Sequence, residues 1–221
     1  MEEFLAGRRS TSPSAQLEIT PDGEVHLLST HEQVLGGPSG QTFVGCRFPA
    51  DPQYADELGQ HAVAVGRRYA AAGAVGRLGV DFVAVGSRGG WSLSALEVNL
   101  RKGGTTHPYT TLRNLVPGRY DQTLGTWVAE LDGRPRSYRA ADSLQHESWR
   151  GLRPGDVIEA VAAAGLEFDR ATETGVVLHM LGGLKVDGRM GLTAIGRDAS
   201  EADALCDATA AAVHQLGQSG R

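Results

Sequence analysis

The feature that most constrains the fold is an alternating segment near the middle of the chain, residues 95–101. Apolar residues there alternate with Glu97, Asn99 and Arg101. A β-strand points every second side chain to the same face, so one face of this strand would carry a carboxylate, an amide oxygen and a guanidinium. The two oxygen groups suit Mg²⁺ that is bound with help from substrate phosphates. Periodicity leaves one alternative open, an edge strand whose polar face is merely solvated.

A second apolar segment precedes this strand, at residues 79–86, and Gly89 and Gly90 supply a turn between the two. The two segments therefore predict a β-hairpin. Antiparallel pairing would bring Asp81 beside Glu97 and Asn99. Two carboxylates and one amide on neighbouring strands would then hold one or two Mg²⁺ ions.

The segment after the second strand is cationic and rich in glycine. Lys102, one of only two lysines in the chain, follows Arg101, and a Gly-Gly-Thr-Thr loop leads to His107. A cation beside the metal ligands suits the charge that develops on a phosphoryl group or an acyl phosphate. Pro108 fits the first position of a helix that runs to Leu115. The start of that helix would direct backbone N–H groups at an anionic group, such as a phosphate or a carboxylate.

The hairpin sequence Gly-Val-Asp-Phe … Leu-Glu-Val-Asn-Leu-Arg resembles the metal-binding hairpin of the ATP-grasp superfamily. Members of that superfamily typically join a carboxylate to an amine or another nucleophile through an acyl phosphate. The resemblance implies ATP and Mg²⁺ as cofactors, with Asp81, Glu97 and Asn99 as metal ligands and Arg101 in contact with phosphate. The longer run Asn-Leu-Arg-Lys-Gly-Gly-Thr-Thr-His-Pro is similar to the pheganomycin-type peptide ligases, a subgroup of the superfamily.

The same resemblance implies the catalytic residues and the substrates. Arg101 and Lys102 would stabilise charge during phosphoryl transfer to a carboxylate and during attack of an amine on the acyl phosphate. His107 would act as a base for the incoming amine or hydrogen-bond the phosphoryl group. The partners would be a small-molecule carboxylate and an amine or peptide.

The nucleotide contacts implied by the resemblance lie earlier in the chain. The motifs Ser-Pro-Ser-x-Gln-Leu and Ser-Thr-His-x-Gln-Val-Leu-Gly-Gly-Pro-x-Gly continue the similarity to the peptide ligases. His31 lies in the second motif, but a loop histidine without a chemical role is the favoured interpretation. The N-terminal candidates would lie near adenine or ribose, and a solvated chain end explains them equally well. The cofactor-binding candidates are Glu2, Glu3, Leu5, Gln16 and Gln33.

The remaining segments predict an α+β fold. Residues 14–19 and 24–29 form a predicted hairpin, 30–40 a polar glycine-rich loop, 41–46 a strand and 54–72 an amphipathic helix. A further hairpin is expected at 126–131 and 134–139, a helix at 155–164, strands at 175–181 and 190–195, and a last helix with Ser200 as its N-cap. We therefore expect a mostly antiparallel sheet packed by helices, as in an ATP-grasp C-terminal subdomain, followed by an α/β tail.

Composition and charge exclude several classes of function. The formal net charge of −5 is spread along the chain without a basic stripe, so we expect no nucleic-acid partner. A charged N-terminus and the lack of a long apolar run predict a cytoplasmic protein with no membrane partner. Cys46 and Cys206 are too few and too far apart for a disulfide framework or a zinc site.

We expect two units, residues 1–118 as the second nucleotide and metal subdomain and residues 119–221 as the C-terminal extension of the peptide-ligase subgroup. The N-terminal domain and first nucleotide subdomain of a complete ATP-grasp ligase would be missing. The leading hypothesis is the catalytic C-terminal part of an ATP-dependent carboxylate–amine (peptide) ligase. An N-terminal half in a longer protein, on a separate chain or from a homo-oligomer would complete it. The alternative is a non-catalytic or truncated remnant that acts as a nucleotide-binding or interaction module.

Overall fold

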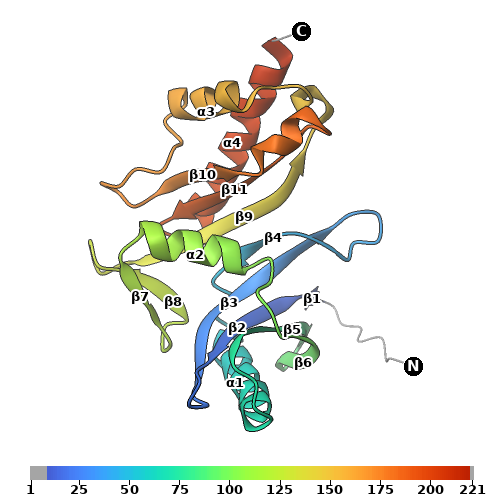
Figure 1. Ribbon diagram of the computed structural model, residues 1–221, viewed down its shortest axis with the longest axis vertical. Helices are drawn as coiled ribbons and strands as arrows, with labels where there is room; N and C mark the ends of the chain where they lie inside the picture. Colours follow the sequence, from blue (N-terminus) through green and yellow to red (C-terminus); the bar gives the residue numbers. More distant parts are fainter. Residues whose placement is uncertain (1–8, 220–221) are drawn as a thin grey trace.

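A mostly antiparallel sheet extends through most of the molecule, and helices cover parts of it (Figure 1). The computed structural model describes residues 9–219. The helices are α1 (Ala55–Ala71), α2 (Thr106–Leu115), α3 (Pro154–Ala163) and α4 (Ala199–Ser219), with short 3-10 helices at Glu147–Trp149 and Leu181–Lys185. The strands are β1 (Arg9–Thr11), β2 (Pro13–Ile19), β3 (Val25–Gly36), β4 (Thr42–Phe48), β5 (Gly76–Ser87), β6 (Gly90–Asn99), β7 (Gly118–Asp121), β8 (Thr126–Ala129), β9 (Pro135–Gln145), β10 (Gly175–His179) and β11 (Arg189–Gly196).

The main path of the sheet has the strand order β1-β5-β2-β3-β4-β9-β11-β10. Strand β6 pairs with β5, and the β7–β8 hairpin joins through β8 to β9. The expected α+β class with a mostly antiparallel sheet is thereby confirmed. Among residues 9–219, no helix is long and apolar enough to span a bilayer.

Helix α1 covers one face of β2, β3 and β5 at the lower end of Figure 1. Its Leu58 and Ala62 pack against Leu17, Val80 and other alternate residues of the strands. Acidic residues in the first turn and a basic residue in the last turn complement the helix dipole. Because this face of the sheet is apolar and covered, the polar side chains of the same strands must lie on the opposite face.

A second apolar core lies at the other end of the sheet, where α4 covers β9, β10 and β11 and α3 packs against α4. Val157 of α3 and Val213 of α4 are buried there against Leu192 and Ala194 of β11. Outside this core, Arg47 and Arg139 pair with Asp203 of α4 at 3.0 and 3.5 Å. The C-terminal helix is therefore attached to the sheet by both apolar and ionic contacts.

The two ends are joined where β4 pairs with β9 and α2 packs beside them. The rings of Phe48 and Tyr138 stack with centroids 5.1 Å apart, and Leu112 and Val116 belong to the same buried cluster. The sheet continues through this junction, and the boundary expected between residues 118 and 119 stays a prediction.

Three local expectations are corrected by the structure. Residues 30–36, expected in a loop, belong to β3, because their backbone pairs with β2 on one side and with β4 on the other. Helix α2 begins at Thr106, so Pro108 is its third residue, where a missing backbone N–H still costs no helical hydrogen bond. Helix α4 begins at Ala199, and Asp198 rather than Ser200 accepts a hydrogen bond from the backbone N–H of Glu201, at 2.8 Å.

Replacing Gly45 should weaken the junction between the two ends. Gly45 pairs with Ala141, and a Cβ atom at position 45 would overlap the backbone carbonyl oxygen of Ala140. We expect Gly45→Ala to lower the free energy of unfolding by about 1–3 kcal/mol, as overpacking commonly does. Urea denaturation followed by circular dichroism measures this change.

Gly155→Ala is the matched control. Gly155 lies in the first turn of α3 with no atom within 4 Å of the position that a Cβ would occupy. Its substitution should leave the stability unchanged or raise it by up to about 1 kcal/mol. Equal losses in both variants would contradict the assigned role of Gly45.

Candidate functional site

Three polar residues of β5 and β6 lie together on the uncovered face of the sheet. Asp81 is directly opposite Glu97, and Gly79 is opposite Asn99. Residues directly opposite in an antiparallel pair share a face, and so do residues two apart in one strand. The structure therefore brings Asp81, Glu97 and Asn99 together as the hairpin predicted.

The Asp81 carboxylate is held by amides from two different strands. Gln33 of β3 donates Nε2 to Oδ1 at 2.7 Å, and Asn99 donates Nδ2 to Oδ2 at 3.0 Å. Because Asn99 donates through Nδ2, its carbonyl oxygen takes no part in the hydrogen bond to Asp81. Burial, followed by repulsion from Glu97, raises the pKa of Asp81, whereas the Gln33 hydrogen bond and the charge of Arg101 oppose that rise.

A cavity of about 230 Å³ opens above these side chains. Ser14 and Gln16 of β2 form part of its floor, and the Oγ of Ser14 is fully buried without a hydrogen-bond partner among residues 9–219. Gly79 leaves room for Gln16, whose Nε2 would lie 3.0 Å from a Cβ at that position. The lining residues are Ser14, Gln16, Gln33, Phe43, Gly79, Asp81, Glu97, Asn99, Arg101, Gly103, Gly104 and Thr105.

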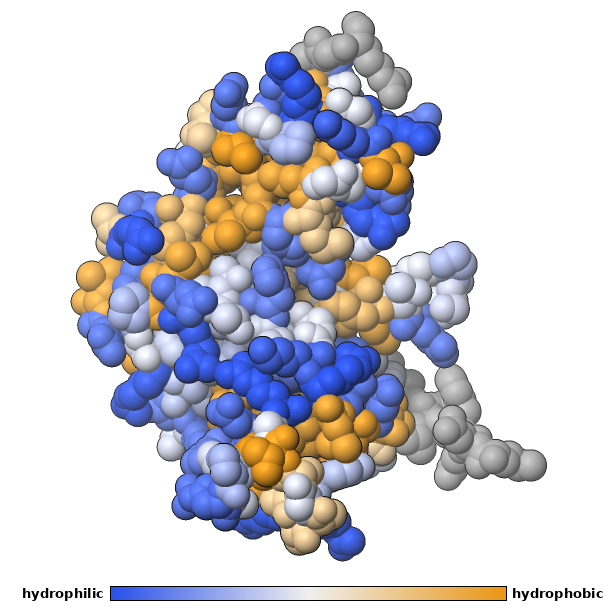
Figure 2. Space-filling view, in the orientation of Figure 1, coloured by the Kyte–Doolittle hydropathy of each residue, from blue (hydrophilic) through white to orange (hydrophobic). Residues whose placement is uncertain are grey.

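The loop between β6 and α2 forms another wall of this cavity. Gly103 is fixed to the start of α2 because its backbone N–H donates to Thr106 Oγ1 at 3.1 Å. Arg101 lines the cavity, whereas the neighbouring Lys102 is exposed and lines the next cavity along the sheet. Hydrophilic residues form a band across the lower half of Figure 2, with a group of hydrophobic residues directly below it.

His107 does not line this cavity. Its ring meets His179 of β10 edge to face, with centroids 4.6 Å apart, and His179 Nε2 lies 3.9 Å from Asp142 Oδ1. Burial raises the pKa of Asp142 although both histidines oppose that rise, and burial together with His107 lowers the pKa of His179. The structure thus directs His107 toward the C-terminal part of the sheet.

His31 is a buried strand residue and not the loop histidine that was expected. Its Nε2 lies 2.6 Å from the hydroxyl of Tyr138, and burial lowers its pKa to about 3. It is therefore neutral near pH 7 and supports the packing of β3 against β9. Ser14 was missed as a site residue, because only the strand register puts it opposite Asp81. Glu2, Glu3 and Leu5 lie outside the described residues.

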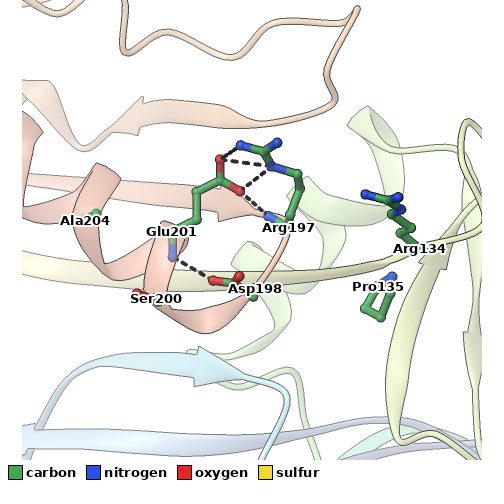
Figure 3. Close-up of a pocket in the computed structure, with 7 residues that line it drawn as sticks. All are labelled: Arg134, Pro135, Arg197, Asp198, Ser200, Glu201 and Ala204. Atoms are coloured by element: carbon green, nitrogen blue, oxygen red, sulfur yellow. Dashed lines mark hydrogen bonds and ion pairs between the residues drawn. The ribbon is translucent and has the colours of Figure 1, made fainter.

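A different cavity, of about 630 Å³, lies at the start of α4 (Figure 3). Three of its charged residues, Arg197, Asp198 and Glu201, already interact with one another, whereas Arg134 stands apart from them. Arg197 Nε donates to Glu201 at 2.9 Å, and Asp198 accepts from the backbone N–H of Glu201. This cavity is therefore a weaker candidate than the one around Asp81.

The donor set around Asp81 fits a hard divalent cation that takes further ligands from a substrate. Two carboxylates and one amide oxygen are suitable ligands for Mg²⁺, which commonly keeps waters and phosphate oxygens as well. The repulsion between Asp81 and Glu97 would be relieved by such a cation. Within residues 9–219, no group of three or more His, Cys, Asp and Glu side chains is placed to hold a metal, so Asn99 and external oxygens would have to complete this site.

Comparisons with known proteins support the fold and the resemblance expected from the sequence. The chain has the fold of the C-terminal part of ATP-grasp enzymes, and the resemblance to that superfamily is confirmed. Over 203 residues it is 37% identical to L-propargylglycine--L-glutamate ligase of Streptantibioticus cattleyicolor, an alignment that covers 92% of this chain and 40% of that ligase. A profile described as the PGM1 C-terminal domain matches residues 156–209.

Two solved structures share the fold at low sequence identity. N5-carboxyaminoimidazole ribonucleotide synthetase (purK), in complex with ADP, superposes with a TM-score of 0.58 at 14% identity, covering 98% of this chain and 52% of that one. The ATPase subunit of phosphoribosylaminoimidazole carboxylase from Aquifex aeolicus gives 0.56 at 13% identity, covering 96% and 58%. The chain thus spans 40% of the length of its curated relative and about half of these structures.

Neutralising Glu97 should lower the pKa of Asp81. Glu97→Gln removes the repulsion that opposes ionisation of Asp81, while the Gln33 hydrogen bond remains. Carbon-13 NMR titration of the aspartate carboxyl groups measures the shift, with Asp81→Asn identifying the signal. Glu130→Gln, an exposed change elsewhere, should leave the signal in place. An Asp81 pKa that is unchanged by Glu97→Gln would show that the two carboxylates do not interact.

Proposed function

We propose that this chain is the C-terminal catalytic part of an ATP-dependent carboxylate–amine ligase that requires Mg²⁺ and acts through an acyl phosphate. The observation that carries the proposal is the pairing of Asp81 with Glu97 across β5 and β6, with Asn99 beside them. Ligand-forming oxygens from two strands meet there on one uncovered face, next to a cationic loop. This arrangement suits a phosphoryl group that is transferred near a metal ion.

The comparisons support the same chemistry. The relative with 37% identity is named as a ligase of two amino acids, and the purK structure contains ADP. The similarity to the ligase extends over 92% of this chain, which includes the metal hairpin and the loop after it. A carboxylate and an amine or peptide are therefore the proposed substrates.

Each side chain has a role in this proposal. Asp81, Glu97 and Asn99 would hold the Mg²⁺, which supplies charge neutralisation at the transferred phosphoryl group. Gln33 fixes the Asp81 carboxylate, and Gln16 is a nucleotide or phosphate contact on the cavity floor.

The loop residues would act on the developing charge. Arg101, which lines the cavity around Asp81, would stabilise negative charge while the substrate carboxylate takes the phosphoryl group and ADP leaves, whereas Lys102 lines the neighbouring cavity. The amine then attacks the acyl carbon, phosphate leaves, and the amine gives up a proton. His107, expected as the base for the amine, lies outside this cavity against His179, and its role stays a prediction.

The rest of the nucleotide cleft would come from an N-terminal half. That half would belong to a longer polypeptide, a separate chain or a second copy of this one. The fraction of the ligase relative that the chain spans, 40%, supports this arrangement. Cation binding is accordingly the first test, because the proposed ligands Asp81, Glu97 and Asn99 all lie within the described residues.

Changes at the metal ligands should weaken binding of Mg²⁺·ADP. Gln33→Ala removes a hydrogen bond to a proposed ligand and should weaken cation binding about 10–100-fold. Glu97→Gln removes a proposed ligand and should cost at least as much. Isothermal titration with Mg²⁺·ADP, and with Mn²⁺ alone, measures both effects, and Glu159→Gln on the exposed side of α3 is the control.

The outcomes separate the two hypotheses. Unchanged binding in Glu97→Gln would remove the residue from the site. Binding of Mg²⁺·ATP without phosphate release in any assembly, including mixtures with candidate N-terminal halves, would favour the nucleotide-binding module over the ligase.

Cation affinity should fall as the pH is lowered. Protons compete with the cation for Asp81, whose pKa is raised, so the fall should begin at a higher pH than for an ordinary aspartate. Above that pKa the carboxylate is ionised and affinity should level off. Mn²⁺ titrations across acidic pH measure the profile, and Glu97→Gln should move its midpoint to lower pH.

A further inference from the structure

We propose that the cavity next to the metal-site cavity binds the carboxylate of the acceptor substrate, so that the acceptor is an amino acid or peptide with a free carboxylate. This inference rests on the proposed ligase function and names the substrate class of the same site. A simple amine such as ammonia would need no anionic subsite.

The second cavity continues the same face of the sheet. Arg77 of β5 lies opposite Glu18 of β2, one step along the face from the pair of Gly79 and Gln16. Arg101 lines both cavities, so it forms the wall between them. The volume is about 660 Å³, and the lining residues are Glu18, Val75, Gly76, Arg77, Leu100, Arg101, Lys102 and Thr110.

The charges in this cavity favour an anion. Three cationic side chains, Arg77, Arg101 and Lys102, line it together with one carboxylate, Glu18. The Nε of Arg77 lies 3.7 Å from Glu18, which is an ion pair but too long for a hydrogen bond. The N–H groups of this guanidinium therefore keep their capacity to donate to a ligand, and a carboxylate matches their geometry.

Lys102 is a second hydrogen-bond donor available to a ligand in this cavity. Its side chain is exposed, and within residues 9–219 it has no hydrogen-bond or ion-pair partner. Its backbone carbonyl oxygen accepts from Arg101 Nη1 at 3.2 Å, which draws the two cationic residues together. The Lys102 ammonium and the Arg77 guanidinium thus line the second cavity. Asp81 and Glu97 line the first, and Arg101 lines both.

The apolar part of the cavity completes the match to an amino acid. Val75 is 62% exposed and Leu100 is 58% exposed, so both apolar side chains are accessible to a ligand in this cavity. They would cover the aliphatic part of an acceptor whose carboxylate lies at Arg77 and Lys102. The acceptor amine would then extend past Arg101 toward the acyl phosphate in the metal-site cavity.

The test compares acids with their amides on the full chain. Glycine, L-leucine and L-glutamate, each beside its α-carboxamide, are titrated into nitrogen-15-labelled protein in the presence of Mg²⁺·ADP. We expect the acids to shift the backbone signals of residues 75–77 and 100–102, and the matching amides to bind about tenfold more weakly. Arg77→Gln should remove this preference and leave ADP binding unchanged.

Two further variants make the result specific. Lys102→Gln should reduce the preference for the acid even if Arg77→Gln fails to fold, since its ammonium has no partner to lose within the described part of the chain. Arg170→Gln makes the same change of charge at an exposed position elsewhere and should have no effect.

Three results would overturn the subsite: equal affinities for acid and amide, no shifts at residues 75–77 and 100–102, or weaker ADP binding in Arg77→Gln. The last of these would mean that the cations serve nucleotide phosphates. If the preference for the acid persists but Mg²⁺·ADP does not bind the unchanged chain, the proposed function fails while the carboxylate subsite stands. If ADP binds and the preference is absent, only the subsite fails.

Discussion

The interaction on which the site depends is an unfavourable one. Asp81 and Glu97 are placed opposite each other on adjacent strands, and Asp81 is partly buried, so both burial and like charge disfavour its ionised form. The hydrogen bonds from Gln33 and Asn99 offset part of that cost and hold the carboxylate in one orientation. A bound cation would offset the rest, which is why this small region of the sheet is the natural place for one.

The remainder of the fold keeps that arrangement in place. The apolar faces of β2 and β5 pack on α1, which fixes the strand register and forces the polar side chains to the other face. On the C-terminal side, Phe48 stacks on Tyr138 where β4 joins β9, and α2 packs beside them. Since α2 follows directly after the loop that walls the cavity, the junction between the two ends of the sheet also positions that loop.

Charge changes sign along the site face. Asp81 and Glu97 face each other across β5 and β6, Arg101 follows the end of β6 and lines both cavities, and Arg77 lies near the start of β5 beside Glu18. A ligase of the proposed kind needs both kinds of surroundings. Carboxylates would hold the metal that binds the phosphates, and cationic side chains would hold an anionic acceptor. The order of these charges gives the proposed reaction a direction, from nucleotide to acceptor, along a single sheet.

The sequence by itself determined the hairpin that carries the proposed metal ligands. Alternation from Leu96 to Arg101, a glycine turn and a second apolar run suffice to place Asp81 beside Glu97, because strand periodicity and hairpin pairing are local properties. Only the tertiary structure decided which residues from distant segments join them. It put Ser14 opposite Asp81, extended β3 through His31 and turned the ring of His107 toward His179. These outcomes depend on which strands pair and on which face is covered, and a polar stretch such as residues 30–36 looks like a loop until its neighbours are known.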